Sequence, residues 1–150
     1  MLERVLVALD REAGAERILS WVRRLVAPLR AEVRLLAVIP PMRTVVIGGR
    51  TVDYVDQLEE AERRAAEAAL GELAARLRDD GLAVTVETRV GDRVTATLAA
   101  ARAWPAEAIA LADSPAPALS WWLGRTASEK LIRRASVPVL FARHSNQHAA

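Results

Sequence analysis

The chain has 150 residues, a net charge of +2 and no cysteine. This length suits one domain that buries its own hydrophobic core, and the lack of cysteine excludes disulfides, thiolate metal sites and cysteine nucleophiles. Apolar residues make up 52% of the chain but aromatic residues only 4%, so the core is expected to consist of small and branched aliphatic side chains, as in helix-covered parallel sheets.

The charges are mixed along the chain. Arginine alternates with glutamate and aspartate, a pattern typical of solvated helix faces and not of a nucleic-acid-binding surface. The first apolar run is short and follows no basic leader, so we expect a cytoplasmic protein with no membrane span.

The first third of the chain predicts a strand, a helix and a second strand. Residues 5–9 and 33–39 are short, apolar, β-branched runs, and residues 15–29 place their apolar side chains on one helical face. Residues 40–52 show no clear periodicity, which predicts a loop across the carboxyl edge of the sheet, with a lid or a dimer arm as the functional alternative.

The middle of the chain predicts a long helix followed by a strand. An apolar stripe runs at helical spacing from Val55 to Leu77, through Leu58, and Gly81 stands where a left-handed helix cap is required. Residues 84–88 alternate as a strand.

The last part predicts two more helices and two more strands. Asp92 can cap a helix that Pro105 ends, and residues 108–111 form a weaker strand candidate. A helical pattern then covers residues 119–135, and residues 137–141 form the last strand.

Strands that alternate with helices of this length require parallel pairing with right-handed crossovers. We therefore predict an α/β fold with a doubly wound five-stranded parallel sheet and helices on both faces, of Rossmann-like type. In such sheets ligands bind beyond the carboxyl ends of the strands. Asp10, the segment around Pro40 and residues 112–117 are expected at that edge.

Several segments, in this order and spacing, resemble the universal stress protein family. The resemblance implies a domain over residues 1–143 and leaves residues 144–150 as a flexible tail. It also implies a homodimer, often formed through the last strand. The segments that carry the resemblance are residues 5–10, 31–38, 90–92, 106–111 and 129–140.

ATP-binding members of this family carry a loop of the form G-x2-G-x9-G-[S/T] after the fourth strand. That pattern falls on Ala112, Pro115 and the pair Arg125-Thr126, so all three glycines are replaced. The Ala112 methyl group hinders a close backbone approach, and Pro115 has no N–H to donate to a phosphate. Arg125 and Thr126 could still bind a phosphate through a guanidinium and a hydroxyl group.

Three further residues match nucleotide contacts in the ATP-binding relatives. Asp10 corresponds to the aspartate beside the nucleoside, although it equally suits a helix cap or a turn. The backbone at Val38 and Ile39 corresponds to the segment that contacts adenine. Backbone contacts leave no side-chain signature, so these residues do not identify a ligand.

The chain contains four tryptophans, and two of them are adjacent. Trp121 and Trp122 are adjacent in a predicted helix, where neighbouring positions diverge by about 100°, so one ring is expected in the core and the other exposed or against a partner. Trp21 and Trp104 are expected in the core.

The sequence does not predict an enzyme, a catalytic residue or a metal site. It contains no histidine before His144, no G-x-S-x-G motif and no Walker loop, and Asp10 has no acidic neighbour of the kind that a phosphoacceptor receiver domain needs.

Two functional hypotheses remain. The first is a stress-response protein that binds no ATP and acts through dimerisation and contacts with an unidentified protein partner. The second is a sensor of ATP or AMP, with magnesium, in which Arg125 and Thr126 replace the glycine loop. We expect the last strand to lie at an edge of the sheet and to pair with a second copy. An apolar edge strand left unpaired tends to aggregate, and this pairing would prevent it. The predicted interface residues are Val137, Val139, Leu140 and Phe141.

Overall fold

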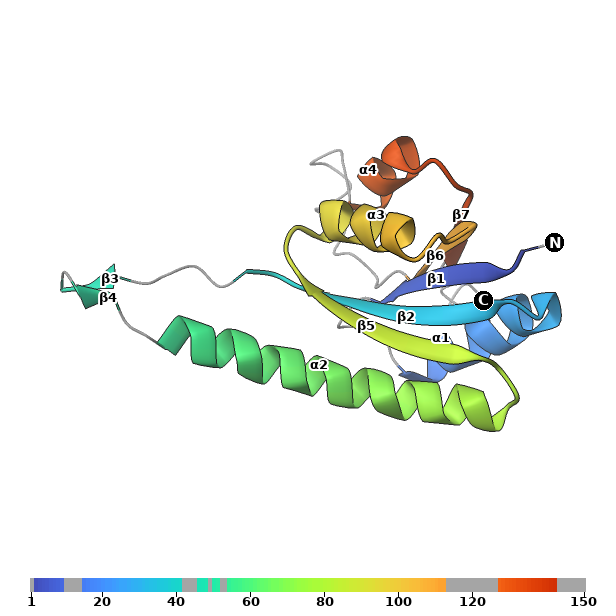
Figure 1. Cartoon of the computed structure of the whole chain (residues 1–150), viewed down its shortest axis with the longest axis horizontal. Helices are drawn as coiled ribbons and strands as arrows, with labels where there is room; N and C mark the ends of the chain where they lie inside the picture. Colours follow the sequence, from blue (N-terminus) through green and yellow to red (C-terminus); the bar gives the residue numbers. More distant parts are fainter. Residues whose placement is uncertain are drawn as a thin grey trace, which may run out of the picture.

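The computed structural model describes residues 2–9, 15–41, 46–48, 50–51, 54–112 and 127–142. Its centre is a five-stranded sheet of parallel strands in the order β5-β2-β1-β6-β7 (Figure 1). The predicted doubly wound parallel sheet is therefore confirmed. Its strands are β1 (Arg4–Leu9), β2 (Glu32–Ile39), β5 (Val84–Val90), β6 (Ala108–Ala112) and β7 (Val139–Ala142).

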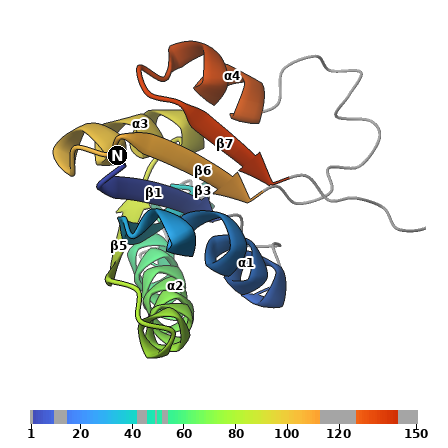
Figure 2. The ribbon, with the colours of Figure 1, turned by 90° about the vertical axis from the view of Figure 1, so that its right-hand side faces the viewer.

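Helices cover both faces of this sheet. In Figure 2 α1 and α2 lie on one face, and α3 and α4 lie on the other. The side chains of each strand alternate between the two faces, so each face has its own core. The helices are α1 (Ala15–Trp21), continued by a π-helix (Val22–Val26) and a 3₁₀ turn (Ala27–Leu29), then α2 (Tyr54–Asp79), α3 (Arg93–Ala103) and α4 (Ala127–Arg134).

The two cores are made of aliphatic side chains, as the composition predicts. The core on the α2 side includes Val5, Val7, Leu19, Val33, Leu35 and Leu77. The core on the α3 side includes Leu6, Leu36, Leu98, Ile109 and Leu131.

The helical segment predicted over residues 15–29 is confirmed, but it is not α-helical throughout. Leu19, Val22 and Val26 of the predicted stripe are fully buried, whereas Leu25 is 50% exposed. The helix widens into a π-helix and then tightens into a 3₁₀ turn. Pro28 has no N–H for a further α-helical hydrogen bond, and Arg30 ends the segment in the left-handed conformation at φ 53°. These two residues explain the irregular end.

The long helix α2 ends as predicted. The Gly81 N–H donates to the Arg78 carbonyl over 2.9 Å, and the Leu82 N–H donates to the Leu77 carbonyl over 3.2 Å. This is a Schellman motif, and it places Gly81 at φ +89°, a conformation that glycine adopts at little cost.

The start of α2 differs from the prediction. Leu70, Leu73 and Leu77 are buried, but Leu58 is 54% exposed although it belongs to the predicted apolar stripe. Figure 1 shows why, since the first turns of α2 extend beyond the end of the sheet. The connection before α2, predicted as a loop without regular structure, contains a short antiparallel hairpin, β3 (Val46–Ile47) and β4 (Arg50–Thr51).

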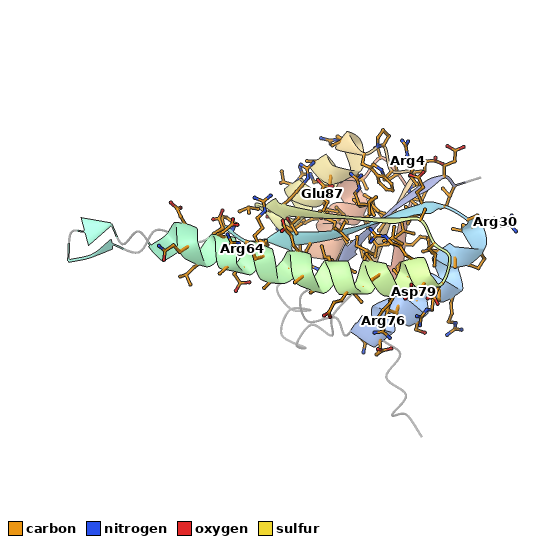
Figure 3. The ribbon with its side chains drawn as sticks, turned by 60° about the horizontal axis from the view of Figure 1, so that its bottom comes forward. Arg4, Arg30, Arg64, Arg76, Asp79 and Glu87 are labelled. Carbon is orange, nitrogen blue, oxygen red and sulfur yellow. The ribbon has the colours of Figure 1, made fainter. Side chains whose placement is uncertain are left out.

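Two ion pairs connect the first helical segment to the end of α2. Glu16 Oε1 lies 2.8 Å from Arg76 Nη1, and Arg23 pairs with Asp80. The hydrogen bond from Arg76 lowers the pKa of Glu16. Figure 3 shows Arg76 and Asp79 on this part of α2.

The tryptophans are only partly in the core. Trp104 is half-buried against the α3-side core, and the guanidinium carbons of Arg34 and Arg4 lie 4.7 Å and 5.9 Å from its ring centre. The ring was expected to be fully buried, but it is partly exposed. Cation–π attraction to the two guanidinium groups stabilises it in this position. Trp21 is also half-buried, against the α2-side core. Trp121 and Trp122 lie outside the described residues.

Across the described residues, the helices are too short or too polar to cross a membrane.

Candidate functional site

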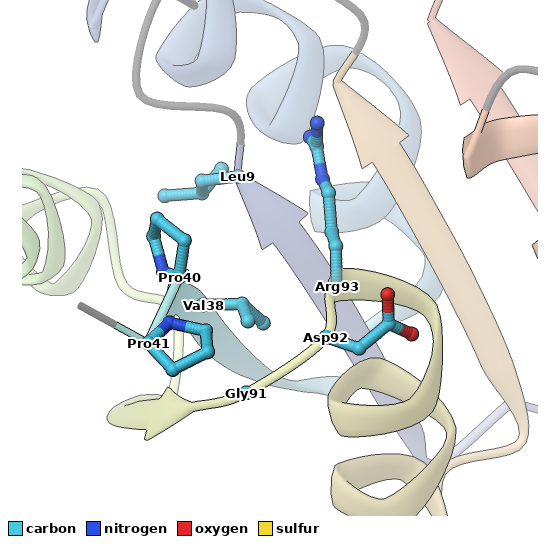
Figure 4. Close-up of a pocket in the computed structure, with 7 residues that line it drawn as sticks. All are labelled: Leu9, Val38, Pro40, Pro41, Gly91, Asp92 and Arg93. Atoms are coloured by element: carbon cyan, nitrogen blue, oxygen red, sulfur yellow. The ribbon is translucent and has the colours of Figure 1, made fainter. Parts of the chain in front are cut away.

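The carboxyl ends of three neighbouring strands surround a pocket of about 460 Å³ (Figure 4). This is the edge of a parallel sheet at which ligands bind. The pocket therefore lies at the expected edge, but on the β2 side of β1, whereas the strand order reverses between β1 and β6. Its lining residues are Leu9 of β1, Val38, Pro40 and Pro41 of β2 and the segment after it, and Gly91, Asp92 and Arg93 after β5.

One side of the pocket is apolar. Leu9 and Val38 are half-buried at the strand ends, and Pro40 and Pro41 continue the wall where β2 ends. Figure 4 shows these four side chains grouped on one side, while the Arg93 side chain extends from the start of α3 past the end of β1. An apolar wall with a guanidinium group nearby can hold a flat ring that carries an anionic group.

Asp92 supplies the N-cap of α3 at the pocket. Its Oδ2 atom accepts a hydrogen bond from the Thr95 N–H over 3.0 Å. The hydrogen bonds from the backbone and side chain of Thr95 lower the pKa of Asp92, and the positive charges of Lys130 and Arg134 on α4 add to this effect. The Asp92 carboxylate is therefore a fixed negative charge beside the pocket, and the predicted cap is confirmed.

Gly91 joins β5 to this cap. Its N–H donates to the Ile39 carbonyl over 3.0 Å, and its φ of +153° is one that other residues rarely adopt. The glycine thus lets the chain turn sharply from the sheet into α3 and brings Asp92 and Arg93 to the pocket.

The structure brings some of the predicted nucleotide residues together. Val38 lines the pocket, and Ala112 lies opposite Leu9 in the pairing of β6 with β1, at the same edge of the sheet. Ile39 is only 2% exposed, and its carbonyl accepts the Gly91 hydrogen bond. Four of the predicted residues lie outside the described residues, namely Asp10, Pro115, Arg125 and Thr126.

Sequence reasoning missed the contribution of Gly91, Asp92 and Arg93 to the pocket. Asp92 was identified only as a cap, although a Gly-Asp pair directly after a strand marks a sharp turn at the carboxyl edge. Arg93 had no local signal, because it resembles the many solvated arginines of this chain.

The predicted dimer strand β7 lies at one edge of the sheet, as expected. Val137 and Val139 are half-buried against the α3-side core, and Leu140 packs against the α2-side core. The Pro138 carbonyl accepts a hydrogen bond from the Ile109 N–H over 3.0 Å, so the backbone groups of Val139 and Phe141 point to the outer edge, with which no strand of the described residues pairs. The side chain of Phe141 lies outside the described residues.

Within the described part of the chain, no three histidine or acidic side chains gather closely enough to hold a metal ion.

A model of the universal stress protein family matches residues 1–143. No curated protein matches the chain significantly. Among solved structures, a universal stress protein family member from Burkholderia pseudomallei has 24% identity and a TM-score of 0.71, with 94% of this chain and 96% of that chain covered. The protein MJ0577 has 22% identity and a TM-score of 0.79, with 97% and 99% covered.

A third solved structure contains a nucleotide. It is the universal stress protein of Archaeoglobus fulgidus in complex with dAMP, with 21% identity, a TM-score of 0.61, and 94% of this chain and 98% of that chain covered. Identities this low establish a shared fold and no more.

Proposed function

The chain belongs to the universal stress protein family, and from this premise we propose that it is a non-catalytic stress-response protein that acts through self-association and contacts with other proteins, without binding ATP. The observation that carries this proposal is the position of Ala112. It ends β6 opposite Leu9, and it is the residue on which the first glycine of the ATP-binding loop pattern falls when that pattern is laid on this sequence.

The chemistry of this edge disfavours a phosphate cradle. A cradle needs backbone N–H groups that approach the phosphates closely, and the sequence has alanine at 112 and proline at 115 in place of two glycines of the ATP-binding pattern, which opposes that. Asp92 adds a fixed negative charge at the pocket, and the Thr95 N–H at the start of α3 already donates to it. Both features weaken phosphate binding.

The edge position of β7 supports self-association. The backbone groups of Val139 and Phe141 point away from β6, and an open apolar edge strand tends to pair with another chain. We expect a homodimer that pairs β7 with β7 of a second copy, through Val137, Val139, Leu140 and Phe141.

A second candidate function is adenine-nucleotide sensing. The pocket favours it, because its apolar wall suits a purine ring and Arg93 lies beside it. The Archaeoglobus fulgidus relative was solved with dAMP. In this chain Arg125 and Thr126, with magnesium, would replace the glycine loop in binding the phosphates.

Calorimetric titration of the nucleotide-free protein with ATP and AMP, in the presence of magnesium, separates the two candidates. The proposal predicts no binding heat at millimolar nucleotide. Binding at tens of micromolar that an Arg93→Ala or Arg125→Ala variant loses would establish the nucleotide sensor instead. The exposed Arg102→Ala is the matched control, since it lies on α3 away from the pocket.

A further inference from the structure

The edge opposite β7 is formed by β5, and no other strand among the described residues pairs with its outer side. β5 is a seven-residue strand, and two of its valines are unusually open, with Val86 38% and Val90 40% exposed. A strand edge of this length is a template for pairing with another chain.

The backbone of β5 alternates between β2 and the open edge. The Val33 N–H donates to the Ala83 carbonyl over 2.9 Å, and the Gly91 N–H donates to the Ile39 carbonyl over 3.0 Å. The odd-numbered residues of β5 therefore direct their backbone groups to β2. Alternation along the strand then directs the backbone groups of Val84, Val86, Thr88 and Val90 outward.

One of these outward groups is already bonded. Arg78 of α2 donates from Nε and Nη2 to the Val84 carbonyl, over 3.0 Å and 2.7 Å. Pairing with another strand is thus limited to the rest of β5. The outward residues that remain are Val86, Thr88 and Val90, and Thr88 is their centre.

We propose that the β5 edge pairs antiparallel with the β5 edge of a second copy of this chain, about a two-fold axis at Thr88. In this register Thr88 lies opposite the partner's Thr88, and Val86 lies opposite the partner's Val90. Glu87 lies opposite the partner's Arg89, on the other face of the sheet. The sheets of the two copies become one.

The cross-strand pairs of this register are complementary. The two exposed valines of each copy cover those of the other, opposite threonines form a favourable pair, and each Glu87 meets an opposite charge. A shift that centres the axis on Glu87 would instead place two carboxylates opposite each other, which is destabilising. The charges of Glu87 and Arg89 therefore favour a two-fold axis at Thr88. The Arg78 hydrogen bonds favour the same axis, because they occupy the Val84 carbonyl and leave Thr88 at the centre of the free outward residues.

The intrachain contacts of these residues fit the same arrangement. Glu87 Oε1 lies 2.6 Å from Arg89 Nε, and Glu87 Oε2 lies 3.6 Å from Arg34 Nη1. The two Glu87 carboxylates of a pair would therefore be surrounded by guanidinium groups of both copies. Figure 3 shows Glu87 on β5, above α2.

Helix α2 brings one more charge close to the axis. The Thr88 hydroxyl donates to Glu67 Oε1 over 3.4 Å, so the Glu67 carboxylates of both copies lie near each other. Arg63 Nε lies 3.4 Å from Glu67 Oε1 and offsets this charge within each chain. The helix therefore adds little repulsion to the pairing.

Cysteine cross-linking tests the register, because the chain has no cysteine of its own. In a hydrogen-bonded antiparallel pair the Cα atoms are about 5.5 Å apart, within the usual range of a disulfide. Oxidised Thr88→Cys is expected to form a covalent dimer that a reductant separates. A mixture of Val86→Cys and Val90→Cys chains is expected to form a mixed dimer, whereas each of the two alone stays monomeric on a non-reducing gel.

The two cysteine experiments do not depend on the β7 dimer. In a β7 dimer Thr88 lies at the opposite edge of each sheet, too far from the partner's Thr88 to form a disulfide. The mixed-dimer experiment keeps the test valid if Thr88→Cys impairs folding. The proposal is overturned if neither experiment gives a covalent dimer. It is also overturned if Val86→Cys alone cross-links as well as Thr88→Cys, since that indicates random collision and no fixed register.

Discussion

Asp92 determines how the chain enters α3 at the carboxyl edge. Its carboxylate accepts the Thr95 N–H, and this bond lowers the pKa of Asp92 below its ordinary value of 3.8. A carboxyl group whose pKa is lowered by folding stabilises the fold at pH values above the unfolded-state pKa. That stabilisation is lost as the pH falls through the lowered pKa of the folded state.

Replacing Asp92 tests this role. Asp92→Ala is expected to lower the thermal unfolding midpoint at neutral pH, because the Thr95 N–H loses its acceptor. Asp92→Asn keeps an oxygen acceptor without the charge, so it should lose less. The difference between wild type and Asp92→Asn should shrink as the pH falls below 3.8 and disappear once the pH is below the lowered pKa of the folded state, and a difference that does not change with pH would contradict a charged cap.

Gly91 is required by its backbone conformation. Its φ is +153°, whereas the nearest atom to an added Cβ would be Ala96 Cβ at an ordinary 3.9 Å, so the expected cost of Gly91→Ala is backbone strain of about 1–3 kcal/mol. Gly71→Ala, in α2 with no atom within 4 Å of the added Cβ, is the control and should stabilise the protein by about 0.5–1 kcal/mol. Urea unfolding measures both, and equal effects would contradict this account.

Single residues were predictable where a local rule decides their conformation. The Asp92 cap and the left-handed Gly81 both follow from the sequence beside them. The position of Arg93 at the pocket and the cation–π contact of Trp104 could not be predicted, because both depend on strands that are distant in the sequence.

Among the elements, the two halves of α2 lie in different environments. Its second half packs on β5 and β2, with Leu77 fully buried, while its first half extends past the sheet, with Leu58 54% exposed. The apolar spacing is continuous over both halves. The sequence therefore predicts the helix but not the point at which the sheet beneath it ends.

Alanine substitutions measure this difference. Leu77→Ala is expected to cost about 2–5 kcal/mol, because it removes methyl groups from a packed core. Leu58→Ala should change the free energy of unfolding by less than about 0.5 kcal/mol in a monomeric chain. A large loss at Leu58 would show that the first half of α2 is covered in solution.

The first helical segment shows a second limit of element prediction. An apolar spacing of three and four residues fits Leu19, Val22 and Val26 in an α-helix and in a π-helix alike. Only Pro28 pointed to a change of geometry, and it does not reveal where the change begins.

At the scale of the whole molecule, the alternation of strands and helices was sufficient to predict the parallel sheet. The resemblance to the universal stress protein family, and not the alternation, predicted that the last strand lies at an edge, and the strand order confirms that position. Side-chain patterns could not predict that the opposite edge, β5, carries the complementary residues Glu87 and Arg89, because that needs the strand order and the direction of each backbone group.

The central claim is that the protein works by self-association through β7. Static light scattering of Phe141→Pro and Phe141→Val tests it most directly. Both variants lose the ring, and both keep the pairing with β6. Only proline also removes the residue-141 N–H, which points away from β6 to the outer edge. The account predicts that Phe141→Val keeps at least twice the 16.3 kDa mass of one chain, and that Phe141→Pro has at most half the mass of Phe141→Val. Equal masses for the two variants, or a single-chain mass for Phe141→Val and wild type at micromolar concentration, would contradict it.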